Sequence, residues 1–106
     1  MNSRERILAA VNHAPVDRVP IDFGGTRQSG ISVFAYAPLR RHLAAGAAAD
    51  PAAPIRIYDL FQMLAEIEPD LAARFGADCA GLNRRAVAFG LVNADWKPWR
   101  LHDGTA

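Results

Sequence analysis

The chain has 106 residues, and its 12 lysines and arginines nearly balance its 11 aspartates and glutamates, giving a formal net charge of +1. This length allows one domain with a modest core, and the even charge argues against nucleic acid or a membrane surface as partner, since both need clustered Lys and Arg. The single cysteine, Cys79, excludes an internal disulfide and favours a reducing, cytoplasmic compartment.

The first predicted element is a helix over residues 3–12. Asn2 can cap it, because Glu5 three residues later can complete a capping box. Apolar residues recur at helical spacing from Ile7 to Val11. No apolar run here or later has the length that a signal peptide or a membrane span requires, so we expect neither secretion nor membrane insertion.

Prolines and glycines organise the next stretch. Pro15 and Pro20 exclude a helix around them, because each lacks a backbone donor and favours an extended residue before it. Residues 19–23 are predicted to form a short strand that ends at Gly24 and Gly25. A pair of glycines suits a sharp turn or the close approach of a ligand.

A second helix is predicted to begin after Ser32 as its cap and to carry Phe34, Leu39 and Leu43. Pro38 either kinks this helix or marks its true start. Residues 44–54 contain only Ala, Gly, Pro and Asp. Having no large apolar side chain to bury, they are predicted to form a surface loop within the domain.

Turn and cap signals divide the following segment. Residues 55–58 are β-prone, and Asp59 is predicted to cap a helix over residues 60–67, where apolar residues have helical spacing. Pro69 is predicted to open a further short helix, and Gly76 to end it.

The last third of the chain reads as extended. Residues 77–82 form a small apolar run that predicts a buried strand, and residues 87–92 and 96–101 are predicted to be extended. Helices alternating with short strands indicate the α/β class with parallel pairing. Two parallel strands near Ile21 and Cys79 cannot form a stable sheet alone, so we expect further strands beyond this chain.

Several runs of residues, spread along the chain from Ser3 to Asp78, carry a family resemblance: Ser3–His13, Asp17–Ile21, Asp22–Thr26, Ser29–Ser32, Arg56–Gln62 and Phe75–Asp78. Together they resemble the N-terminal part of the uroporphyrinogen decarboxylase family, within the branch that also contains corrinoid-dependent methyltransferases. The resemblance implies a (β/α)8 TIM barrel of about 250 residues or more, with its active site at the carboxyl ends of the strands. Residues 1–106 would be its incomplete N-terminal portion.

The same resemblance implies the site residues. Decarboxylases of this family carry an Arg-Gln-Ala-Gly-Arg signature after the first barrel strand, and its arginines hold substrate carboxylates. The matching residues here are Arg27, Gln28, Ser29, Gly30 and Ile31. The resemblance therefore implies that Arg27 grips a carboxylate and that Gln28, Ser29 and Gly30 line the site, whereas Ile31 replaces the second arginine.

Two functions follow from the resemblance. The first is cofactor-free, metal-free decarboxylation of a small-molecule substrate, a porphyrinogen or another polycarboxylate, with no catalytic acid assigned in this chain. The alternative is methyl transfer between a corrinoid protein and a thiol at a zinc site whose ligands lie outside this chain. The whole protein can be a homodimer, and the isolated chain is expected to be inactive, because one arginine loop cannot supply the rest of a barrel site.

Other polar residues have simpler interpretations. Asp22 and Asp78 adjoin apolar runs, where a carboxylate needs a partner, so structural hydrogen bonds are favoured over catalysis. Cys79 is predicted to be a small core residue and a poor nucleophile. The histidines His13, His42 and His102 lack partners at metal-ligand spacing.

Overall fold

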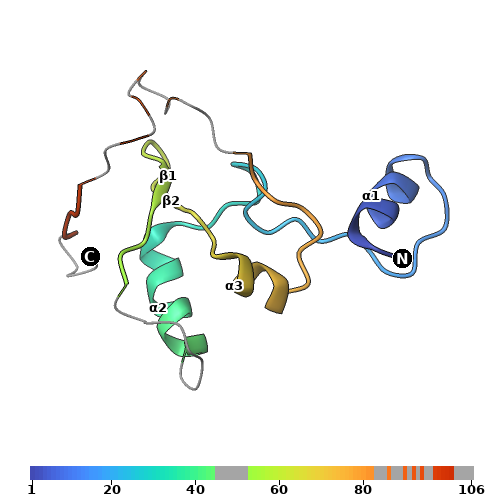
Figure 1. The fold of residues 1–106 in the computed structure, drawn as a ribbon, viewed down its shortest axis with the longest axis horizontal. Coiled ribbons are helices and arrows are strands. Elements are labelled where there is room, and N and C mark those ends of the chain that lie inside the picture. The colour runs from blue at the N-terminus through green and yellow to red at the C-terminus, as the bar shows by residue number, and fades with distance from the viewer. Residues whose placement is uncertain are drawn as a thin grey trace. The chain divides into compact units, whose positions relative to one another are not determined.

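The computed structural model describes residues 1–44, 53–82, 86, 90, 92, 94 and 97–101. Its elements in chain order are α1 (Ser3–Val11), α2 (Val33–Ala44), β1 (Ile57–Asp59), β2 (Leu64–Ala65) and α3 (Pro69–Arg74) (Figure 1). They belong to two compact units: the first unit is Met1–Gly30 with Ile67–Leu82, and the second is Ile31–Glu66 with Asn83–Ala106. Over the described ranges, no helix combines the length and apolar character needed to cross a membrane.

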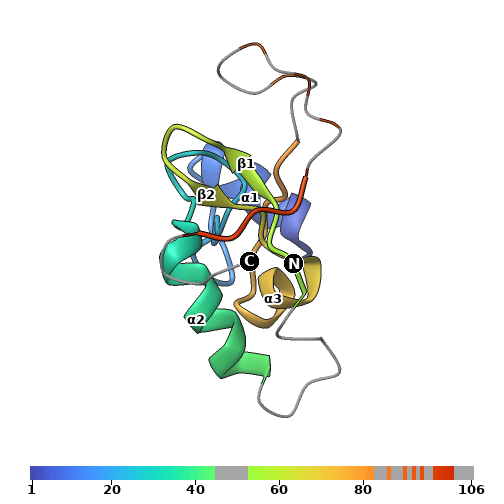
Figure 2. The same cartoon turned by 90° about the vertical axis from the view of Figure 1, so that its left-hand side faces the viewer.

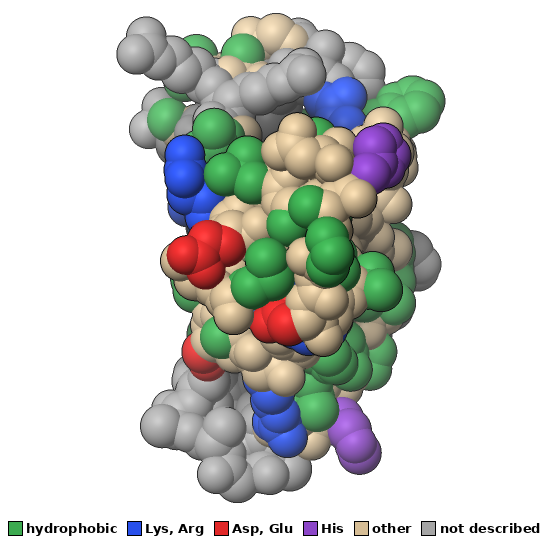
Figure 3. Space-filling view, turned by 90° about the vertical axis from the view of Figure 1, so that its right-hand side faces the viewer, with side chains coloured by type: hydrophobic (Ala, Val, Ile, Leu, Met, Phe, Trp, Pro, Cys, Tyr) green, Lys and Arg blue, Asp and Glu red, His purple; other side chains and the backbone are tan. Residues whose placement is uncertain are grey.

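Helix α1 confirms the predicted cap but not the predicted burial. The Asn2 side chain accepts the Glu5 backbone N–H, the Glu5 carboxylate accepts the Asn2 backbone N–H, and both distances are 2.9 Å. Yet Leu8 and Val11 are 45% and 71% exposed, and the buried residue of α1 is Arg6. The residue that α1 buries is therefore a cation. Figure 3 shows one face of the molecule, on which hydrophobic side chains lie at the surface among scattered charged ones.

Helix α3 agrees with its prediction. It begins at Pro69, which needs no backbone donor in the first turn. It stops before Gly76, whose φ of 68° is in the left-handed region. Leu71 is buried, and the Phe75 ring meets Phe23 edge to face with centroids 5.2 Å apart. This contact joins α3 to the segment that leads into the glycine pair.

The two strands predicted in the first unit are not formed. Residues 19–23 and 77–82 have no strand assignment, and Ile21 and Leu82 are 39% and 97% exposed rather than buried. The physical reason lies in the donors. Pro20 has no N–H, and the Ile21 N–H bonds to the side chain of Asp78 at 2.9 Å instead of to a backbone carbonyl.

The two segments nevertheless run side by side in the same direction. The Asp78 N–H donates to the Ile21 carbonyl at 2.7 Å. Three residues further along both segments, a Cβ at Gly81 would lie 3.2 Å from the Gly24 carbonyl oxygen. The first unit thus holds two parallel segments, in which the Asp78 carboxylate accepts the Ile21 N–H where a strand would use a backbone carbonyl.

The helix predicted over residues 60–67 is wrong, because this segment is a turn followed by β2. The Asp59 Oδ1 atom accepts the backbone N–H groups of Phe61 and Gln62, each at 2.9 Å. An aspartate that caps a helix forms the same hydrogen bonds, so Asp59 has the predicted capping contacts, but they stabilise a turn instead of a helix. Met63 closes the turn with a φ of 54°.

Strands β1 and β2 form an antiparallel pair, in which Ile57 lies opposite Ala65 and Asp59 opposite Leu64. On its other side β2 meets the chain before α2, through an antiparallel bridge between Ser32 and Leu64. Within the described residues this small sheet is antiparallel; the parallel pairing was predicted for residues 19–23 and 77–82, which form no strands. The barrel itself stays a prediction.

Helix α2 passes through Pro38, so it neither starts there nor stops before it. Ser32 is the predicted cap, and its hydroxyl accepts the Phe34 N–H at 3.4 Å. Phe34 itself is 38% exposed, because the helix turns another face toward the neighbouring β2 (Figure 2). The buried residues of that face are Val33, Tyr36, Ala37 and Arg40. Arg40 is accommodated there by donating to the Ala53 carbonyl.

Some predictions fall outside the described residues. Of the loop predicted over residues 44–54, residue 44 ends α2 and residues 45–52 are not described. Most of the segment 87–92 and the first residue of 96–101 also lie outside, although Ala86 and Val92 form an isolated antiparallel bridge.

Candidate functional site

Three of the predicted site residues, Arg27, Gln28 and Ser29, lie in a loop, residues 22–29, that its own polar groups hold closed. At its start, the Asp22 Oδ1 atom accepts the Gly25 N–H at 2.9 Å. The Thr26 hydroxyl reaches the other Asp22 oxygen at 3.5 Å. Across the loop, the Gly24 N–H donates to the Ser29 carbonyl at 2.9 Å. Asp22 therefore has the structural hydrogen bonds that its sequence context predicts.

Arg27 and Gln28 lie at the tip of this loop, between two hydroxyl residues that bind one another. The Thr26 and Ser29 side-chain oxygens are 3.0 Å apart, and the Ser29 hydroxyl also accepts the Thr26 N–H at 3.0 Å. Arg27 is half-buried and Gln28 is exposed. Ser29 therefore shapes the loop with its hydroxyl, and the half-buried Gly30 follows it.

Both glycines of the pair are required by the loop. Gly24 has a φ of 84°, and a Cβ there would lie 2.6 Å from Ile67 Cδ1. A Cβ at Gly25 would lie 2.4 Å from Asp22 Oδ1 and 3.0 Å from Cys79 Cβ. The pair serves both the sharp turn and the close packing that two adjacent glycines indicate.

Beside the loop, Asp78 is a buried carboxylate at the centre of a group of charged side chains. Its side chain is 0% exposed. The Oδ1 atom accepts from Arg6 Nη1 at 2.5 Å and from Arg18 Nη2 at 3.0 Å. The Oδ2 atom accepts from Arg18 Nη1 at 2.7 Å and from the Ile21 N–H at 2.9 Å. Asp78 is thus structural, as the sequence favours, and it saturates its acceptor sites.

Arg6 extends this group to a second carboxylate. Its Nε and Nη2 atoms bind the two oxygens of Asp17 at 2.7 and 2.8 Å, and Nη2 also donates to the Met1 carbonyl at 2.7 Å. A guanidinium used in this two-pronged way is strongly oriented. Arg6, Asp17, Arg18 and Asp78 are termed the arginine–aspartate cluster below.

The cluster holds its acids ionised. The pKa of Asp78 is well below its usual range, first because of the Ile21 backbone hydrogen bond and then because of Ser3, Arg18 and Arg6, against the opposing effect of burial. The pKa of Asp17 is lowered chiefly by its hydrogen bonds from Arg6, whose own pKa is raised by the same contact. Both carboxylates are therefore charged at neutral pH.

Sequence reasoning missed this cluster although its residues carry the family resemblance. Asp17, Arg18 and Asp78 stand in the quoted runs, but the ion pair between Arg6 and Asp78 spans 72 positions. One signal was present: Arg6 stands directly before Ile7, the start of an apolar pattern, where a cation needs a partner.

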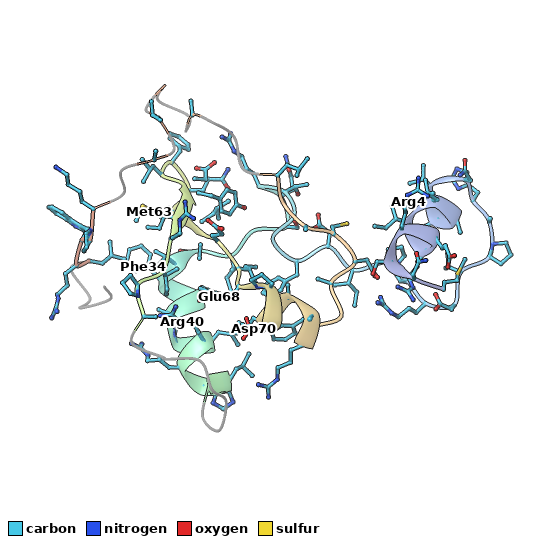
Figure 4. All side chains as sticks on the ribbon, viewed as in Figure 1. Arg4, Phe34, Arg40, Met63, Glu68 and Asp70 are labelled. Atoms are coloured by element: carbon cyan, nitrogen blue, oxygen red, sulfur yellow. The ribbon has the colours of Figure 1, made fainter. Side chains whose placement is uncertain are left out.

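Cys79 packs against the loop at Gly25, but its thiol is not activated. Burial is the main cause that raises the pKa of the Cys79 thiol, with the charges of Asp22 and Asp78 adding to it, which makes this thiol a poor nucleophile, as predicted. Glu68 and Asp70 lie at the start of α3 (Figure 4), where burial and then the Asp70 charge raise the pKa of Glu68. Among the described residues, no three His, Cys, Asp or Glu side chains are grouped so that they could hold a metal ion.

No protein-family model, curated protein or solved structure matches the chain. We therefore infer a function from the residues at the tip of the loop and from the hydrogen bonds that close it.

Proposed function

We propose that this chain is the carboxylate-binding N-terminal part of a barrel enzyme similar to the uroporphyrinogen decarboxylase family, acting on a porphyrinogen or another polycarboxylate. One observation carries the proposal: Arg27 lies half-buried at the tip of a loop that Thr26 and Ser29 close beneath it. The run from Arg27 to Ile31 supports it, because it agrees with the five-residue family signature at the first, second and fourth positions.

The loop suits carboxylate binding for physical reasons. A guanidinium presents parallel N–H donors that match the two oxygens of a carboxylate. Because side-chain hydrogen bonds already close the loop, less conformational entropy is lost when a ligand binds to Arg27. Gln28 is exposed next to it and offers an amide donor.

Such a grip serves decarboxylation by orientation. Holding one acetate group of a polycarboxylate fixes which carbon–carbon bond faces the proton donor of the barrel. That donor protonates the pyrrole ring, and the electron pair of the breaking bond returns to the ring as carbon dioxide leaves. The exocyclic carbon then takes up a proton and the ring gives one back, so that the acetate group becomes a methyl group. With Ile31 at the position of the family's second arginine, the loop offers one guanidinium, so it is expected to hold one carboxylate at a time.

Binding of uroporphyrin, the stable fluorescent relative of the porphyrinogen, tests the proposal. The purified 106-residue chain is titrated and the dissociation constant is obtained from the change in fluorescence. Arg27→Gln is expected to weaken binding about tenfold, equivalent to about 1.4 kcal/mol. Arg4→Gln is the matched control, because Arg4 is an exposed arginine on α1 and lies outside the loop (Figure 4).

Retention of affinity by Arg4→Gln together with its loss in Arg27→Gln supports the proposal. Equal losses in both variants indicate attraction to general positive charge and reject a grip by Arg27. Absence of binding by the unaltered chain at micromolar to millimolar uroporphyrin rejects it as well.

A further inference from the structure

Asp78 forms hydrogen bonds with both backbone polar groups of Ile21. Its carboxylate accepts the Ile21 N–H at 2.9 Å, and its own N–H donates to the Ile21 carbonyl at 2.7 Å. Both backbone polar groups of Ile21 thus bind one residue. Ile21 directly precedes Asp22, whose carboxylate closes the start of the Arg27 loop through Gly25.

The residues after Asp78 pack against the same loop without slack. Cys79 Cβ would be 3.0 Å from a Cβ at Gly25. A Cβ at Gly81 would lie 3.2 and 3.5 Å from the carbonyl oxygens of Gly24 and Gly25. A side chain larger than that of glycine would therefore be crowded at either position, and the segment after Asp78 packs closely against the loop.

Asp78 is itself held firmly. Two guanidinium groups, those of Arg6 and Arg18, bind its buried carboxylate, and Arg6 lies on the capped helix α1. Arg18 also donates to the carbonyls of Val19 and Gly76, at 3.1 and 3.0 Å. It therefore links the segment that leads to Ile21 with the segment that leads to Asp78.

We infer that Asp78 is a positioning residue for Arg27: its buried carboxylate fixes the backbone at Ile21 and so sets where the loop presents the guanidinium. This role rests on the proposed function, because Arg27 matters only if it binds a carboxylate. It differs from a purely structural role, in which loss of Asp78 would lower stability and leave the geometry of the folded loop unchanged.

A double-mutant cycle separates the two roles. Uroporphyrin binding is measured for the unaltered chain, Asp78→Asn, Arg27→Gln and the double variant, with each value corrected for the folded fraction. Asp78→Asn is expected to weaken binding about tenfold when Arg27 is present and less than about twofold in Arg27→Gln. The smaller effect is expected because Asp78 affects binding through the position of the Arg27 guanidinium, which Arg27→Gln lacks. Equal factors in the two backgrounds would refute the positioning role.

A second measurement needs no ligand. Amide hydrogen exchange at Gly24 and Gly25, whose N–H groups bind within the loop, reports how firmly the loop is held. Asp17→Asn removes the negative charge that pairs with Arg6 and leaves the acceptor of Ile21 in place, so it serves as the matched variant. Exchange at the two glycines is expected to be at least about tenfold faster in Asp78→Asn than in Asp17→Asn.

Equal exchange in these two variants would overturn the positioning role even if Arg27 binds uroporphyrin. Conversely, failure of the unaltered chain to bind, with fast exchange confined to Asp78→Asn, would reject the proposed function and leave the hold of Asp78 on the loop intact. If Asp78→Asn does not fold, Asp78→Glu replaces it in both experiments. Glutamate keeps the charge and moves the acceptor by one methylene, so binding and exchange are expected to change in the same direction.

Discussion

At the scale of single residues, two glycines show how the same backbone angle serves different purposes. Gly24 and Gly76 have φ angles of 84° and 68°. A Cβ at Gly76 meets nothing nearer than 3.8 Å, whereas one at Gly24 would lie 2.6 Å from Ile67 Cδ1. Gly76 therefore needs only its conformational freedom, and Gly24 needs its small size as well.

Alanine substitutions should separate these requirements. Gly76→Ala is expected to lower the free energy of unfolding by about 1–2 kcal/mol, the cost of left-handed backbone at an alanine. Gly24→Ala adds overpacking against Ile67, a further cost of about 1–3 kcal/mol. Urea unfolding measures both, and adding Ile67→Ala to Gly24→Ala should recover part of the overpacking. Equal losses at the two glycines would contradict the packing argument.

At the scale of elements, the features set by neighbouring residues were the ones that the sequence predicts well. The ends of α1 and α3 follow from a capping box and from a proline and a glycine, which act within a turn. The helix expected over residues 60–67 failed because the same apolar spacing also fits a turn and a short strand, and β1 supplies the partner that decides.

The same distinction applies to the candidate site. The loop around Arg27 is contiguous in the sequence, so its closing residues lie within a few positions of one another. The arginine–aspartate cluster pairs Arg6 with Asp78, and no pattern in the sequence around either residue indicates the other. This pairing depends on how distant segments pack, which the local sequence does not show.

The turn between β1 and β2 allows a test at the element scale. Asp59→Ala removes the acceptor of the Phe61 and Gln62 N–H groups and is expected to lower the free energy of unfolding by about 1–3 kcal/mol. Asp59→Asn keeps a side-chain oxygen at that position and should cost less. Urea denaturation of the two variants gives the comparison, and an asparagine as harmful as the alanine would show that the turn does not depend on this acceptor.

At the scale of the whole molecule, the arginine–aspartate cluster makes stability depend on pH. The pKa values of Asp17 and Asp78 are depressed from an ordinary 3.8, so the folded chain resists the protons that the unfolded chain accepts. Their contribution is complete above the ordinary carboxyl pKa and is lost as the pH falls toward the folded values.

The urea midpoint is therefore expected to be nearly constant between about pH 7 and pH 5 and to fall below about pH 4. Asp78→Asn should be less stable at neutral pH but should lose less on acidification, because one of the two depressed carboxylates is gone. Midpoints followed from pH 7 to pH 3 measure both effects. Curves for the two proteins that stay parallel would contradict the assignment to Asp78.

The long span between Arg6 and Asp78 also bears on biosynthesis. The ribosome makes the amino end first, so α1 emerges while its acidic partner, 72 positions later, has not been translated. Until then the Arg6 guanidinium can bind Asp17 and the Met1 carbonyl but not Asp78. Native attachment of α1 during translation must wait for the codon of Asp78 to be read and its product to leave the exit tunnel.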